Sequence, residues 1–176
     1  MELLSEMPRI FWAGDSTVKQ NDFTSYPQCG IGQGFSLFVK KEILIVNRAE
    51  NGRSTKSFID EGRLEFIKEN IHKGDFLFIQ FGHNDEKNDP LRYTDPQTTF
   101  KENLRTFIDT ARNAGAYPLL ITPLYRRLFT EEGKLVDNTH LTYPHAMLEV
   151  GRECDVPVID LCTMSRRNCL LYTSPS

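Results

Sequence analysis

The sequence has no long apolar run and little excess charge. None of its apolar stretches approaches the ~20 residues that a membrane-spanning helix requires. The first residues, 1–8, contain neither the basic segment nor the apolar segment of a signal peptide. The formal net charge of -3 gives no reason to expect nucleic acid or an anionic membrane as a partner. We therefore expect a protein that binds neither of them.

The cysteines are few and lack the spacing of a metal site. Cys29, Cys154, Cys162 and Cys169 form no C-x-x-C pair. With no export signal, four scattered cysteines indicate reduced thiols and a cytoplasmic location. A phosphate-binding loop of the G-x-x-x-x-G-K-[ST] type is also missing. Nucleotide binding through such a loop is therefore excluded.

The composition of the chain is that of one globular domain. The chain has 176 residues, of which 39% are hydrophobic and 26% charged. Apolar, β-rich runs alternate with longer helical patterns, which predicts an α/β fold with a five-stranded parallel sheet between layers of helices. The predicted strands span residues 9–13, 43–46, 76–79, 118–121 and 156–160. The predicted helices span residues 35–41, 55–70 (two short helices or one broken near Gly62), 100–111 and 143–154. The run 43–46 has the pattern of a strand buried on both faces, and Pro157 places the last strand at a sheet edge.

Polar residues follow the first three predicted strands at the point where each strand ends. They are Gly14-Asp15-Ser16, Asn51-Gly52 and Gly82-His83-Asn84. Right-handed crossovers bring the carboxyl ends of parallel strands to one rim of a sheet, where α/β folds bind ligands. Ser16 is the candidate nucleophile, and its own N–H, the N–H of Gly52 and the amide of Asn84 can stabilise a developing oxyanion. The alternative is that residues 15–17 only cap the following segment.

These residues resemble the first three sequence blocks of the SGNH (GDSL-like) hydrolases. The longer motifs, with Gly82-His83-Asn84-Asp85 in the third block and Thr122-Pro123 after the fourth strand, are most similar to those of the rhamnogalacturonan acetylesterase branch. The resemblance covers about residues 10–166. It implies a three-layer, flavodoxin-like fold, hydrolysis of acetyl esters on a pectic sugar, and no metal or organic cofactor. It also implies Ser16 as nucleophile and Ser16, Gly52 and Asn84 as oxyanion donors.

Two neighbouring residues are assigned to the substrate side of the same site. His83 belongs to the third sequence block, which indicates that it supports the structure or orients the substrate. Asp15 is assigned to substrate binding, with the alternative that it only fixes the turn through its own backbone hydrogen bonds. The expected partner is a small molecule or an oligosaccharide.

The family pattern has a fourth element that this sequence does not match. A serine hydroxyl needs a base, and the resemblance implies an Asp-x-x-His pair near the carboxyl terminus whose histidine takes the proton. No histidine follows Asp160, and the single Asp-x-x-His by spacing, Asp137 to His140, lies before the fifth predicted strand. We interpret His140 as a decoy unless it lies within reach of Ser16, the alternative being that it replaces the missing base. The sequence therefore predicts little or no esterase activity from this chain.

The last residues support the hypothesis of a truncated reading frame. Residues 168–176 show no helical period and end in turn formers. We therefore expect an incomplete esterase domain over residues 9–166 and a non-native tail over residues 168–176. Without its terminal helix the sheet would bury less apolar surface, and the free energy of unfolding would fall.

Two other functions remain open at this point. A metal-dependent phosphoesterase could use the Gly-Asp and Gly-His-Asn-Asp segments as ligands for two cations. A non-catalytic binding module could hold a sugar at the same rim without cleaving it. Arg126 and Arg127 could bind an acidic sugar or form plain surface charge.

Overall fold

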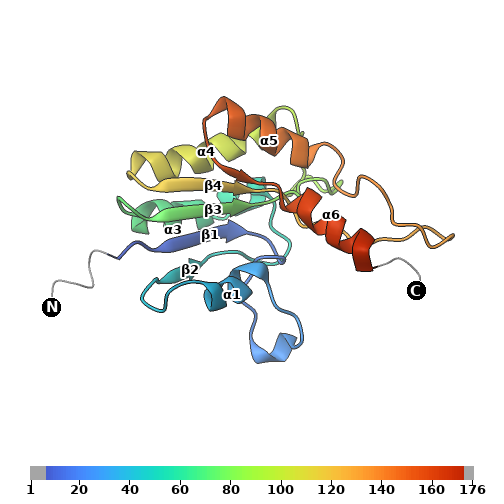
Figure 1. The fold of residues 1–176 in the computed structure, drawn as a ribbon. Coiled ribbons are helices and arrows are strands. Elements are labelled where there is room, and N and C mark those ends of the chain that lie inside the picture. The colour runs from blue at the N-terminus through green and yellow to red at the C-terminus, as the bar shows by residue number, and fades with distance from the viewer. Residues whose placement is uncertain (1–6, 173–176) are drawn as a thin grey trace.

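The computed structural model describes residues 7–172, which form a five-stranded parallel sheet between two layers of helices (Figure 1). The strand order is β2-β1-β3-β4-β5. The strands are β1 (Ile10–Gly14), β2 (Ile45–Asn47), β3 (Phe76–Gln80), β4 (Tyr117–Ile121) and β5 (Val158–Ile159). The predicted three-layer α/β class is confirmed, as is the edge position of the strand that follows Pro157.

Within the described residues, the helices before β5 occupy the crossovers that connect successive parallel strands, and the last helix follows β5. They are α1 (Ile31–Phe35), α2 (Thr55–Asp60), α3 (Arg63–Asn70), α4 (Thr99–Asn113), α5 (Tyr143–Glu153) and α6 (Leu161–Tyr172), with short 3-10 turns η1 (Phe23–Ser25) and η2 (Ser36–Phe38). Gly62 separates α2 from α3 with a φ of 72°, a left-handed conformation that suits glycine. The prediction of two short helices is therefore correct. No helix within residues 7–172 is long and apolar enough to cross a membrane.

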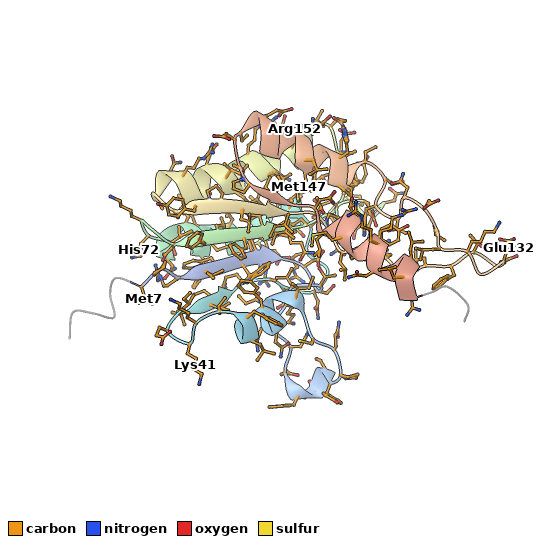
Figure 2. All side chains as sticks on the ribbon, viewed as in Figure 1. Met7, Lys41, His72, Glu132, Met147 and Arg152 are labelled. Carbon is orange, nitrogen blue, oxygen red and sulfur yellow. The ribbon has the colours of Figure 1, made fainter. Side chains whose placement is uncertain are left out.

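The two faces of the sheet are covered to different degrees. The face covered by α2, α3, α4 and α5, which we call the closed face, holds the larger core, with Phe58, Leu77 and Phe107 all at 0% exposure. The face covered by α1 and α6, which we call the open face, buries Trp12 but leaves Phe78 half-buried. Met147 of α5 points toward the sheet and Arg152 away from it (Figure 2).

Two predictions about the open face are wrong. The first helix does not lie at 35–41, because Ile31 and Phe35, one helical turn apart, place α1 earlier and pack it on the open face. The run 43–46 is not a strand buried on both faces. The strand is Ile45–Asn47, which pairs only with β1 at the sheet edge and is half-buried throughout.

The carboxyl-terminal segment also differs from its prediction. Residues 168–172 belong to α6, although the sequence shows no helical period there. The Asp160 carboxylate accepts the backbone N–H of Thr163 at 3.2 Å at the start of this helix, and Leu161 packs on the open face. These contacts fix the first turn, from which the helix continues. Residues 173–176 lie outside the described part of the chain.

Candidate active site

Backbone and side-chain contacts tie the exits of β1, β2 and β3 together at one rim. Gly14 and Gln80 are register partners in adjacent strands. The backbone N–H of Glu50 donates to the carbonyl oxygen of Gly14 at 3.1 Å. The side-chain amide of Asn84 donates to the carbonyl oxygen of Arg53 at 3.0 Å. The loops that carry Ser16, Gly52 and Asn84 are therefore mutual neighbours.

The turn that carries Ser16 is fixed by Asp15. The Asp15 carboxylate accepts both the backbone N–H of Thr17, at 2.8 Å, and its hydroxyl, at 2.7 Å. Asp15 is 1% exposed, and burial raises the pKa of its carboxyl above the ordinary value. A side chain at Gly14 would lie 2.9 Å from Val18 and 3.0 Å from the carbonyl oxygen of Gln80, so only glycine fits before the turn. These contacts are those of a turn-forming residue, and the part of Asp15 in substrate binding stays a prediction.

Ser16 itself is half-buried at the start of this turn. Within the described residues its hydroxyl forms no hydrogen bond. A serine hydroxyl without a hydrogen-bonded base is a weak nucleophile. The turn that carries the predicted nucleophile is thus formed, and no base is hydrogen-bonded to Ser16 within residues 7–172.

The two further predicted donors, Gly52 and Asn84, are held in place by the backbone and by neighbouring loops. Gly52 has a φ of +75°, and the nearest atom to a Cβ built there is 3.8 Å away, so conformation rather than space requires glycine. Asn84 is 3% exposed and uses one amide hydrogen on Arg53. A side-chain amide has two N–H donors, so this bond leaves one of them for another acceptor.

Asp85 is a supporting residue, whereas the sequence had offered it only as a metal ligand in the phosphoesterase alternative. Its Oδ1 accepts the backbone N–H of Thr55 at 3.0 Å, the hydroxyl of Thr55 at 2.5 Å and the hydroxyl of Thr94 at 3.1 Å. Thr55 begins α2, so the carboxylate also lies at a helix N-terminus, where negative charge is favoured. Burial of the carboxyl raises its pKa to about 7. Asp85 therefore links the loop of Asn84 to the helix that follows Gly52. Its position directly after Asn84 was the one sequence signal for this role.

The two histidines nearest the site pack against each other. The ring centroids of His83 and His140 are 4.3 Å apart. Nε2 of His140 lies 2.8 Å from the carbonyl oxygen of Leu124, and Nδ1 lies 3.3 Å from the carboxylate of Glu86. Burial, together with the nearby His140 and Arg126 side chains, lowers the pKa of His83 to about 3, so His83 is neutral at physiological pH. Both ring nitrogens of His140 are thus engaged by groups other than Ser16.

Arg126 belongs to the same cluster. Its guanidinium pairs with Glu86 at 2.5 Å and donates to the carbonyl oxygen of His83 at 3.0 Å. An arginine neutralised by a carboxylate in this way supports the loop after β3 rather than forming plain surface charge. Arg127 is exposed, with its guanidinium 5.6 Å from the ring centroid of Phe129.

A parallel sheet between helices, with serine, glycine and asparagine from three strand exits gathered at one rim, defines a hydrolase domain of the three-layer α/β type. The chain belongs to the GDSL-like Lipase/Acylhydrolase family, whose model matches residues 13–174. This is a family of carboxylic ester hydrolases.

Two relatives from Bacillus subtilis (strain 168) are similar over most of this chain. "Rhamnogalacturonan acetylesterase RhgT" is 45% identical over 158 residues, which are 90% of this chain and 66% of that protein. "Probable rhamnogalacturonan acetylesterase YesY" is 45% identical over 157 residues, which are 89% of this chain and 71% of that protein. The chain thus spans about two thirds of the length of these relatives.

Solved structures share the fold. The crystal structure of protein YXIM from Bacillus subtilis has a TM-score of 0.80 and 29% identity, covering 95% of this chain and 46% of that one. An acetylxylan esterase mutant from Geobacillus stearothermophilus, Axe2-H194A, has a TM-score of 0.68 and 15% identity, covering 96% of this chain and 81% of that one. At 15% identity this second likeness shows the fold alone.

Proposed function

We propose that the chain is the nucleophile-bearing part of a carbohydrate acetylesterase, acting on acetyl esters of rhamnogalacturonan or related pectic oligosaccharides. The observation that carries this proposal is the meeting of Ser16, Gly52 and Asn84 at one rim, through loops that contact one another. The names of the two Bacillus subtilis relatives support the acetyl group and the sugar class.

The proposed reaction proceeds through an acetylated serine. The Ser16 hydroxyl oxygen attacks the acetyl carbonyl carbon, and the carbonyl oxygen becomes negative. The N–H groups of Ser16 and Gly52 and the amide of Asn84 stabilise that charge, where losing one donor typically raises the barrier by roughly 3 to 4 kcal/mol. The sugar hydroxyl leaves with a proton, and water then hydrolyses the acetyl-serine to acetate and restores the Ser16 hydroxyl.

The first step also requires a base that takes the Ser16 proton. All four histidines of the sequence, His72, His83, His140 and His145, lie in the described residues, and none is hydrogen-bonded to Ser16. We therefore expect this chain alone to release little or no acetate.

The metal-dependent alternative lacks an assembled ligand set in the structure. Among residues 7–172, no three His, Cys, Asp or Glu side chains are grouped so that they could hold a metal ion. The Asp85 carboxylate, which that alternative would use, instead binds Thr55 and Thr94. Activity lost in EDTA and restored by a divalent cation would favour this alternative.

The test is acetate release from acetylated rhamnogalacturonan by three proteins. These are the chain itself, a longer product that carries a carboxyl-terminal Asp-x-x-His segment, and the Ser16→Ala form of that product. We expect release by the longer product only. Ser36→Ala, which removes an exposed serine on η2, is the matched control and should keep full activity. Equal release with and without the Ser16 hydroxyl would remove the nucleophile assignment.

A further inference from the structure

The loop between the nucleophile turn and α1 forms a projecting arm, residues 20–30, which carries two exposed aromatic rings. Figure 1 shows the arm, in light blue, projecting below the sheet beyond α1. Phe23 is 97% exposed and Tyr26 is 83% exposed. Large apolar side chains that are almost fully exposed on the same short segment indicate a binding surface more often than isolated ones do.

Hydrogen bonds hold the shape of this arm. The Gln33 side chain accepts the backbone N–H of Asn21 at 3.1 Å and donates to its carbonyl oxygen at 3.2 Å. The Asp22 carboxylate accepts the backbone N–H of Thr24 at 2.9 Å and so caps η1. These bonds fix both ends of the segment that presents Phe23, so its ring is held in solvent by the fold of the arm.

The two rings line a pocket together with polar side chains. The pocket has a volume of about 280 Å³, and its lining includes Gln20, Asp22 and Gln28 beside Phe23 and Tyr26. This volume lies near the lower end of the range for small-ligand pockets. Aromatic faces beside amide and carboxylate groups suit a ligand with an apolar ring face and hydroxyl edges, which is the chemistry of a pyranose sugar. The lining includes no Lys or Arg, so a phosphate or nucleic acid is a poor match.

The arm is continuous with the nucleophile turn. Its far end returns to the site, because the backbone N–H of Ile31 donates to the carbonyl oxygen of Thr17 at 2.7 Å. Gly30 packs so tightly there that a Cβ would lie 2.1 Å from the carbonyl oxygen of Lys19. Phe23 is seven residues after Ser16, which limits their separation to about 24 Å at full extension. An oligosaccharide of a few sugars can span that distance.

We propose that the arm is a carbohydrate subsite in which Phe23 and Tyr26 pack against pyranose rings of the chain whose acetyl ester is presented to Ser16. The catalytic part of this statement rests on the proposed esterase function. The binding part does not, since the arm contacts sugar rings and not the acetyl group.

The test measures binding of a rhamnogalacturonan oligosaccharide by isothermal titration calorimetry, with the acetylated and the deacetylated ligand. All proteins carry Ser16→Ala to prevent turnover. We expect Phe23→Ala combined with Tyr26→Ala to weaken binding of both ligands at least tenfold. The matched control is Leu37→Ala combined with Phe38→Ala, which removes two equally exposed apolar side chains on η2 outside this pocket, and it should bind like the parent.

Three results would overturn the subsite. They are no binding of either ligand to the parent, equal binding by the parent and the arm variant, and an equal loss in the control variant. A change in oligomeric state caused by the arm variant, measured by size-exclusion chromatography, would instead make the arm a contact between copies of the chain. If the esterase proposal fails but the arm variant still loses the deacetylated ligand, the subsite stands alone.

Discussion

The closed and open faces of the sheet support different parts of the site. On the closed face, Tyr143 of α5 donates its hydroxyl to the carbonyl oxygen of Asp85 at 3.0 Å, and Asn103 of α4 donates to the hydroxyl of Thr55 at 3.0 Å. The loops of Gly52 and Asn84 therefore rest on helices packed into the larger core. On the open face, the segment after Ser16 is anchored by Val18, whose carbonyl oxygen accepts the side-chain amide of Asn47 at 2.8 Å.

The predicted oxyanion donors and the predicted nucleophile are therefore supported by layers that bury unequal numbers of apolar side chains. The donors are backed by a core whose aromatic residues are fully buried. The nucleophile turn is backed by a short helix and by Trp12, whose ring packs edge-on against Phe35 and Phe78 at centroid distances of 5.7 and 5.0 Å. Substitutions on the two faces should therefore differ in their effects.

The largest expected effect compares the same substitution on each face. Phe107→Ala on the closed face removes a side chain with 0% exposure, so we expect a loss of about 3–5 kcal/mol in the free energy of unfolding. Phe78→Ala on the open face removes a half-buried ring, and we expect about half of that loss. Urea unfolding measures both, and equal losses would contradict the distinction between the faces.

The second prediction concerns the pH dependence that Asp85 gives to the closed face. The unfolded chain releases this proton near the ordinary pKa of 3.8, while the folded protein keeps it until about pH 7. The free energy of unfolding should therefore fall between about pH 4 and pH 7, by up to about 1.4 kcal/mol per pH unit, and stay level above that range.

Asp85→Asn cannot titrate and should remove this part of the slope. The measurement is urea unfolding of parent and variant at a series of pH values, and the control is Asp60→Asn, an exposed carboxylate on α2. A parent and variant with parallel pH profiles would show that Asp85 titrates alike in the folded and unfolded chain.

The sequence predicted which strand exits meet at the rim of the sheet. It did not predict the hydrogen bonds that connect their loops. The strand exits follow from short apolar runs that end at glycine or polar residues. Gly52 and Gly82 mark turns by their positive φ, and Gly14 ends β1 where a Cβ would clash. The bond from Thr55 to Asp85 joins residues 30 positions apart, and no periodicity or spacing rule indicates it. The half-buried state of β2 depends on its place at the sheet edge, which a run of apolar residues does not reveal.

The carboxyl-terminal helix shows the same limit. The pattern of residues 168–172 does not favour a helix, yet α6 extends through them because its first turn is fixed by Asp160 and by Leu161 on the open face. Tertiary contacts thus override local preference, as they commonly do for weakly patterned segments.

The smallest expected effect concerns a polar side chain on the open face. Gln80 is 1% exposed, and neither atom of its amide has a hydrogen-bond partner within residues 7–172. By strand alternation it points to the same face as Phe76 and Phe78. Because a buried polar group without a partner costs stability, Gln80→Leu should raise the free energy of unfolding by about 1–2 kcal/mol. Thermal and urea unfolding measure this, with Gln97→Leu at an exposed position as the control. A loss of stability in Gln80→Leu would mean that the open face is packed as well around this residue as the closed face is around Phe107.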